Sequence, residues 1–216
     1  MLELVRSWVF PSACEGCDRP GPALCAACAP TVADTIHFAI DGIPATALGA
    51  YGGPLRDAIL AMKRGARDPL AAFAQLLDAV AIEGALVPLP TTAARAAERG
   101  FDQSIALART VAARRSLSCL ELLVKHGPPQ AGRGREKRLA SAGRFRLKPG
   151  VALPPTVTLL DDVCTTGATI RDAVALLRTQ HVRVERIILV ARSEAQERAP
   201  VVPATGAVGP GANARR

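Results

Sequence analysis

The segment spanning residues 157–170 carries the side chains with the most evident chemistry. An apolar stretch leads into two adjacent carboxylates, Asp161 and Asp162, and the chain then reads Val-Cys-Thr-Thr-Gly-Ala-Thr. Backbone N–H groups of such a loop, together with the start of a following helix, form an anion site, and Gly167 lets the backbone approach closely. Carboxylates repel a phosphate but accept hydrogen bonds from ribose hydroxyls. The segment therefore predicts a site for a ribose 5-phosphate.

The predicted site divides into two sets of residues. Asp161 and Asp162 are the candidate catalytic residues, because they would orient the ribose. The candidate phosphate-binding residues follow them directly: Val163, Cys164, Thr165, Thr166, Gly167, Ala168 and Thr169. The alternative is an ordinary strand–turn–helix in which a threonine caps the helix. Two adjacent aspartates before Thr-Thr-Gly-x-Thr favour the ligand site.

A second candidate site is made of four cysteines near the N-terminus. Cys14 and Cys17 form one Cys-x-x-Cys pair, and Cys25 and Cys28 form another after seven intervening residues. Four thiolates in this arrangement can close a tetrahedral, structural zinc site whose metal supplies folding energy. Two disulfides or a redox-active pair are the alternatives. Disulfides are disfavoured in a cytosolic chain, and a redox motif would not need duplication.

Composition indicates one main domain with a small appended module. The chain has 216 residues, of which 49% are hydrophobic, enough for a substantial core. No uninterrupted apolar stretch approaches the roughly 18 residues of a membrane-spanning helix, so no membrane insertion is expected. Residues 1–11 lack a signal-peptide pattern and read as a short amphipathic helix. We therefore expect a cytoplasmic protein.

The net charge is +8, and its excess is local. Residues 95–148 contain 13 Lys and Arg against 4 Asp and Glu, a net charge of +9. Such a segment predicts a polyanionic partner, either a pyrophosphate-bearing substrate or nucleic acid. Alternatively, arginine is used wherever the surface tolerates a cation.

Strand and helix patterns alternate along the chain. Strands are expected within residues 36–51, 85–90, 118–124, 156–160 and 186–190, and helices over residues 54–62, 69–82, 99–115 and 170–180. This order predicts an α/β fold with a mainly parallel sheet flanked by helices, whose ligands lie beyond the carboxyl ends of the strands. The expected organisation is a helix and cysteine module (1–33), an α/β domain (34–192) and a disordered tail (193–216). Residues 125–147 read as a long basic loop.

Taken together, these features resemble the ComF family of bacterial proteins, which joins a four-cysteine zinc module to a type I phosphoribosyltransferase-like domain. The run at 161–169 resembles the signature that binds 5-phosphoribosyl pyrophosphate (PRPP). Three further segments carry the resemblance: 51–56 with Ile59 and Lys63; 87–90 with Arg95 and 99–103; and Gln130, Gly132, Arg138 and Phe145. The chain departs from the family at Asp102, where Asn is usual, and at Arg133, where Leu is usual. After Arg138, Ser141 is the nearest candidate for an expected Asn.

The resemblance implies roles for several cations. Lys63, Arg95 and Arg99 would contact the pyrophosphate, with Mg²⁺ bridging substrate oxygens. The alternatives are solvated arginines at a helix end and a surface lysine. The loop at 127–141 would act as a lid, with Arg135, Lys137 and Arg138 neutralising the leaving pyrophosphate.

Three functions are compatible with these features. The first is a phosphoribosyltransferase that transfers a 5-phosphoribosyl group to an acceptor that the sequence does not identify. The second is a non-catalytic competence factor for DNA uptake, with single-stranded DNA and competence proteins as partners. The third is a regulator that senses PRPP without turnover. An oligomer is compatible with each of them.

Overall fold

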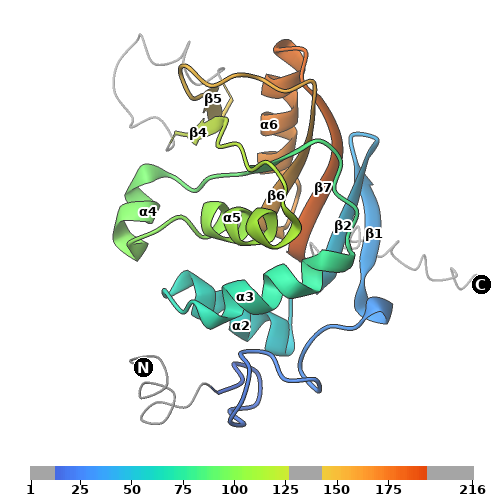
Figure 1. The fold of residues 1–216 in the computed structure, drawn as a ribbon, viewed down its shortest axis with the longest axis vertical. Coiled ribbons are helices and arrows are strands. Elements are labelled where there is room, and N and C mark those ends of the chain that lie inside the picture. The colour runs from blue at the N-terminus through green and yellow to red at the C-terminus, as the bar shows by residue number, and fades with distance from the viewer. Residues whose placement is uncertain (1–12, 127–142, 194–216) are drawn as a thin grey trace, which may run out of the picture.

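A five-stranded, mainly parallel sheet forms the centre of the computed structural model, which describes residues 13–126 and 143–193 (Figure 1). The strand order is β1-β2-β7-β6-β3. The strands are β1 (Ile36–Ile40), β2 (Ile43–Ala50), β3 (Ala85–Pro88), β6 (Thr156–Cys164) and β7 (Arg183–Arg192). Only the β1–β2 pair of this sheet is antiparallel. The predicted α/β class is confirmed.

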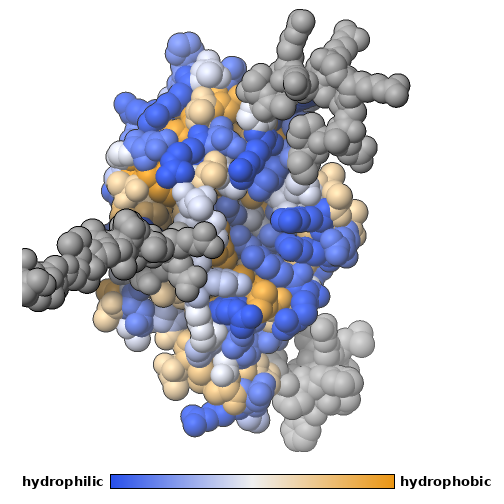
Figure 2. Space-filling model, turned by 180° about the vertical axis from the view of Figure 1, so that it is seen from behind, coloured by the Kyte–Doolittle hydropathy of each residue, from blue (hydrophilic) through white to orange (hydrophobic). Residues whose placement is uncertain are grey.

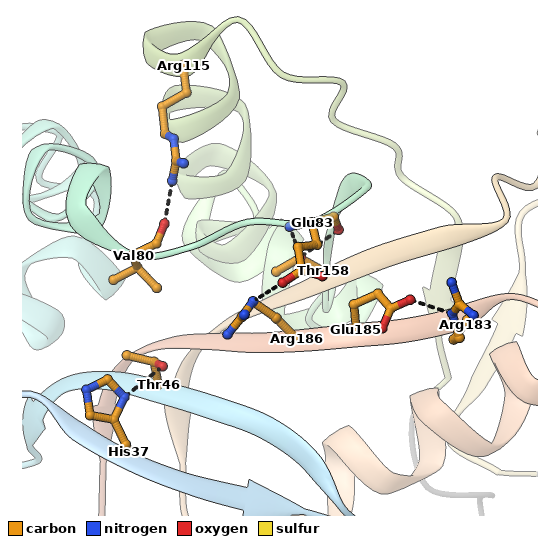
Figure 3. Close-up of polar contacts among 9 residues, drawn as sticks. All are labelled: His37, Thr46, Val80, Glu83, Arg115, Thr158, Arg183, Glu185 and Arg186. Atoms are coloured by element: carbon orange, nitrogen blue, oxygen red, sulfur yellow. Dashed lines mark hydrogen bonds and ion pairs between the residues drawn. The ribbon is translucent and has the colours of Figure 1, made fainter.

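The antiparallel pair is a tight hairpin within the predicted range 36–51. Its turn consists of Asp41 and Gly42, which both have positive φ, at 51° and 78°. Two consecutive residues of this kind match the right-handed twist of the flanking strands. Across the pair, the His37 ring and the Thr46 hydroxyl lie within hydrogen-bond distance, 3.2 Å (Figure 3).

Two layers cover the sheet, each with its own apolar cluster. One layer consists of α2 (Gly53–Lys63), α3 (Asp68–Leu76) with the 3₁₀ turn η2 (Leu77–Ala79), and α5 (Gln103–Arg115). The other consists of α6 (Ala168–Thr179) and the antiparallel pair β4 (Leu123–Lys125) and β5 (Phe145–Leu147). Leu160 and Ile188 belong to the first cluster, whereas Leu159 and Ile187 belong to the second. This split follows from the alternation of side chains along a strand.

Two helix predictions were wrong at their boundaries. The helix expected over 69–82 ends at Leu76, and the chain is extended again at Val80. The helix expected over 99–115 begins only at Gln103, as α5, and Arg99 is instead the last residue of α4 (Ala93–Arg99), a helix that was not predicted. Gly100 separates them with a φ of 78°, a left-handed conformation that ends helices and favours glycine. Asp102 then caps α5.

Several strand predictions also need correction. The strand expected at 118–124 is only β4, and β5 lies at the end of the segment read as a loop. Three-residue strands are too short to show a periodicity. β6 continues past Leu160 because β7 runs beside it as far as the Cys164–Arg192 pair. The first 3₁₀ turn, η1 (Val32–Asp34), leads from the cysteine module into β1.

A polar cluster fastens β3 to β6 where the two strands begin (Figure 3). The Thr158 hydroxyl is fully buried; it accepts from the Glu83 N–H (2.9 Å) and donates to the Glu83 carbonyl (2.8 Å). The Glu83 carboxylate pairs with Arg186 of β7 at 2.6 Å. Gly84 has a φ of 71°, and a Cβ there would lie 2.3 Å from the Thr156 carbonyl oxygen. Only glycine fits at this crossing.

Three predicted segments lie wholly or mainly outside the described residues: the N-terminal helix, the lid loop and the C-terminal tail. In the part that the structure describes, no helix is long and apolar enough to cross a membrane. The face opposite to that of Figure 1 is mostly hydrophilic, with apolar residues in separate patches (Figure 2).

Candidate functional site

The acidic pair lies inside β6 rather than after it. Asp161 pairs with Leu189 of β7, and the strand continues to Cys164. The neighbouring strand β3 ends earlier, at the Pro88–Leu160 pair. Beyond the end of β3, the first two residues of α5 contact the acidic pair: Gln103 contacts Asp162 and Ser104 contacts Asp161. The pair therefore lies at the carboxyl end of the sheet, where ligands bind in open α/β folds.

Asp162 has partners on both carboxylate oxygens. Its Oδ2 forms an ion pair with Lys63 Nζ at 2.9 Å and lies 3.5 Å from the donating Gln103 Nε2. Its Oδ1 accepts from the Val163 N–H at 2.7 Å. The residue is only 7% exposed. Lys63, predicted as a pyrophosphate ligand, therefore ends α2 in contact with an aspartate predicted to bind ribose.

Asp161 has a different environment. Its Oδ1 accepts from the Asp162 N–H (2.9 Å) and from the Ser104 hydroxyl (3.2 Å). Within residues 13–126 and 143–193, no hydrogen bond reaches its Oδ2. Burial, and next the charge of Asp162, raise the pKa of Asp161 to about 8, although the Asp162 N–H, Lys125 and Ser104 act in the opposite direction. A carboxyl group with this pKa is largely protonated at neutral pH in the ligand-free protein.

The predicted phosphate loop leads from β6 into α6. Thr165 and Thr166 are exposed, and Gly167 takes the expected positive φ, 75°, directly before the helix. Arg171 donates to the Thr166 carbonyl (2.8 Å) and pairs with Asp41 in the β1–β2 turn (3.2 Å). The loop is thus held to the hairpin at the sheet edge.

Arg144 holds the other side of this loop. It donates to the Thr169 hydroxyl and pairs with Asp172 of α6, both at 3.2 Å. Sequence reasoning missed Arg144 and Arg171. Arg171 follows Gly167 by four residues, a helical spacing that points to the loop, whereas Arg144 lies 25 residues from Thr169 and gives no local signal.

Three of the predicted phosphate-binding residues offer little to an anion through their side chains, and the Val163 N–H already donates to Asp162. Val163 packs with the α2–α5 cluster, and Cys164, 5% exposed, belongs to the cluster beneath α6. The Ala168 N–H lies 3.4 Å from the Thr166 hydroxyl. Backbone N–H groups, not these side chains, are what this segment can present to an anion.

Arg95 and Arg99 lie on α4, just beyond the carboxyl end of β3. Arg95 is exposed and Arg99 is half-buried. In the described parts of the chain, neither guanidinium forms a hydrogen bond or an ion pair, so neither is brought into contact with the acidic pair. Their charges are free for an anionic ligand.

Asp102 shapes the loop that leads to α4. One carboxylate oxygen accepts from Ser104 and Ile105 N–H groups (both 3.1 Å), capping α5. The other accepts from the Thr91 N–H at 2.6 Å. An asparagine offers only one acceptor oxygen, so the aspartate at this position makes a contact that the Asn usual in the family could not.

The four predicted cysteine ligands converge. Their Sγ atoms all lie within 4.8 Å of one another, and Cys17 and Cys25 are 3.7 Å apart. A tetrahedral zinc site with Zn–S bonds of about 2.3 Å separates its sulfurs by about 3.8 Å. All four thiols are free in the structure, so none of the possible disulfide pairings is formed. The cluster fits a structural zinc ion.

Hydrogen bonds and burial make these thiols unequal. The Cys25 N–H, which lies 3.4 Å from the Cys14 sulfur, is the main cause that lowers the pKa of Cys14 to about 6. Desolvation is the main cause that raises the pKa of Cys28 to about 12. Metal binding would therefore displace protons, and zinc affinity would rise with pH. The cysteine module packs closely against α2. A Cβ added at Gly16 would lie only 2.4 Å from the Pro54 Cβ.

The predicted lid residues Arg135, Lys137 and Arg138 lie outside the described residues, as do Gln130 and Gly132.

A comparison with known proteins finds a distant homologue. The chain is 35% identical over 92 residues to competence protein ComFC of Streptococcus pneumoniae. The match covers 42% of this chain and 40% of that protein, so it spans less than half of the relative's length. No protein-family model matches the chain. The four-cysteine cluster and this match together support the resemblance drawn from the motifs.

Proposed function

We propose that this chain, a distant member of the ComF family, binds PRPP together with Mg²⁺ and acts as a phosphoribosyltransferase-type protein. The observation that carries the proposal is the juxtaposition at the end of β6. There, two carboxylates are followed after four residues by Gly167, whose positive φ leads into the N-terminus of α6. One part suits ribose hydroxyls and the other suits a 5′-phosphate.

The residues would act mainly by positioning and electrostatics. N–H groups at 165–169 would hold the 5′-phosphate, and the acidic pair would orient the ribose as positive charge develops at C1. The free guanidinium groups of Arg95 and Arg99 would attract the pyrophosphate. Mg²⁺ would arrive with PRPP, bound mainly by substrate oxygens and water, and would supply positive charge to the leaving group.

Calorimetry of PRPP binding with and without Mg²⁺ tests the proposal. Thr165→Val removes an exposed hydroxyl of the loop at nearly constant volume, and we expect it to weaken binding about tenfold, the value of one hydrogen bond to a charged group. Thr179→Val, in the last turn of the same helix, is the matched control and should bind normally. Absence of Mg²⁺-dependent PRPP binding by the unsubstituted protein would refute the proposal. Pyrophosphate release distinguishes an enzyme from a PRPP sensor.

A second candidate function is the handling of single-stranded DNA. It is favoured by the name of the relative, a competence protein, and by the net charge of +8. Phosphate contacts would dominate, so affinity should fall steeply with salt. Arg95→Ala should weaken binding of a labelled oligonucleotide in fluorescence anisotropy, whereas Arg178→Ala, on the last turn of α6, should not. If the two substitutions weakened oligonucleotide binding equally, that result would count against a DNA-binding site that includes α4.

A further inference from the structure

The two aspartates differ in what they leave available to a ligand. Both oxygens of Asp162 are engaged, by Lys63 and Gln103 on one side and the Val163 N–H on the other. Asp161 uses only Oδ1, so its Oδ2 is the carboxylate oxygen of the pair without a partner in the described residues. Lys63 of α2 and Gln103 of α5 reach Asp162, whereas Ser104 of α5 is the described side chain that donates to Asp161.

The Lys63–Asp162 pair is well shielded from water. The side chains are 24% and 10% exposed, unlike the mostly solvated ion pairs elsewhere on the described surface. Lys63 ends α2, a helix whose apolar side is buried against the sheet, so its reach is restricted. Pulling it away to meet a pyrophosphate would leave a buried carboxylate without its counter-ion, which is strongly unfavourable.

Gln103 belongs to the same cluster. It is 5% exposed, its amide N–H₂ faces Asp162, and its Oε1 has no partner among the described residues. A buried amide in this position fixes the carboxylate while keeping an acceptor beside it.

We propose that Asp161 alone of the pair contacts the ribose hydroxyls, and that Lys63 and Gln103 are positioning residues that hold Asp162 as an internal ion pair. This inference rests on the proposed PRPP function. It reassigns Lys63, which the resemblance places on the pyrophosphate, to the support of the acidic pair.

The proposal predicts how binding depends on pH. The charged or titratable groups that face Asp161 are Asp162 and Cys164 on β6 and Lys125 on β4, with Lys63 of α2 neutralising Asp162. A ribose hydroxyl donates to an ionised carboxylate, so affinity should rise with pH as Asp161 loses its proton. Removing the Lys63 charge leaves Asp162 uncompensated and should move the midpoint of this rise to higher pH. Removing the Asp162 charge should move it to lower pH.

Calorimetry of Mg²⁺–PRPP binding between about pH 6 and pH 9 tests these shifts in the full chain. We expect Asp161→Asn to weaken binding about tenfold at the alkaline end and to abolish the rise. Lys63→Met and Asp162→Asn should shift the midpoint in opposite directions, and Lys63→Arg should restore it. If Lys63 had a purely structural role, Lys63→Met would lower the affinity for PRPP without moving the midpoint. If Lys63 contacted the pyrophosphate directly, the same substitution would lower that affinity by an equal factor at every pH. Either result overturns the proposal, as does normal binding by Asp161→Asn.

A second readout separates this inference from the proposed function. The Asp161 carboxyl can be titrated by carbon NMR in the ligand-free protein and its Lys63→Met and Asp162→Asn variants. Failure of PRPP binding with the expected carboxyl shifts would refute the proposed function and the ligand contact of Asp161, but would support the role of Lys63. Unshifted titration would refute that role whether or not PRPP binds.

Discussion

Replacing Asp161 by Asn should stabilise the ligand-free protein at neutral pH. Asn keeps an oxygen that can accept from the Asp162 N–H and the Ser104 hydroxyl, and it removes a carboxyl that must ionise in a poorly solvated place. The pKa of this carboxyl rises from an ordinary 3.8 to about 8 in the folded protein. An acid with a raised pKa favours folding below its unfolded pKa, and that contribution is lost as pH rises through the folded value.

The size of the effect follows from the same two values. Each tenfold difference in proton affinity corresponds to about 1.4 kcal/mol, so the carboxyl costs at most about 4 kcal/mol of unfolding free energy near pH 7. Relaxation of the strand end toward solvent would relieve part of this cost. We therefore expect Asp161→Asn to raise the unfolding free energy by about 2 kcal/mol near pH 7 and by almost nothing near pH 4.

Urea unfolding of the zinc-loaded protein at several pH values measures this difference. Asp57→Asn, at a residue whose side chain is 46% exposed and pairs with Arg56, is the matched control and should change stability by less than about 0.5 kcal/mol. Asp162→Asn should have the opposite sign and destabilise the protein, because it leaves the shielded Lys63 charge unpaired. An Asp161→Asn protein that is less stable than the unsubstituted chain near pH 8, or a difference independent of pH, would refute the reasoning.

Three further predictions concern other parts of the molecule. Native mass spectrometry should find one zinc ion per chain, and Cys17→Ser should lose it; a fully folded protein without metal would contradict this expectation. Gly84→Ala should lower the unfolding free energy by more than about 2 kcal/mol in urea titrations, whereas Gly150→Ala, also at positive φ but in open space, should cost less. Arg171→Met should weaken calorimetric binding of ribose 5-phosphate several-fold by releasing the phosphate loop from the β1–β2 turn, and unchanged affinity would show that the loop holds its shape alone.

The parts of the fold with local signals could be predicted from the sequence. Asp41-Gly42 indicates a tight hairpin turn, and the positive φ of Gly167 is required by the change from strand to helix. The break at Gly100 has a local signal too, since glycine ends helices and Asp102 is a strong cap, but the prediction overlooked it by beginning the helix at Arg99.

Contacts between distant segments could not be predicted in this way. Lys63 and Asp162 are brought together only because α2 packs on the face of the sheet toward which Asp162 points. Ser104 and Gln103 read as ordinary first-turn residues of a helix, and their contacts with the acidic pair depend on where β3 ends. The cysteines are an exception, because their spacing already implies that their side chains converge.

The length of β6 is the reason that two identical neighbours acquire different chemistry. If the strand ended at Leu160, as its apolar run suggests, both aspartates would lie in a loop and could turn toward the same ligand. Pairing with β7 as far as Cys164 instead fixes their backbone as strand, and the two carboxylates meet different partners. Both contact α5, but Asp162 alone forms an ion pair with Lys63 of α2, whereas Asp161 keeps a carboxylate oxygen without a partner in the described chain. An extension of four residues thus gives two neighbouring carboxylates different surroundings: one lies in an internal ion pair, and the other has an oxygen that no described residue contacts by a hydrogen bond.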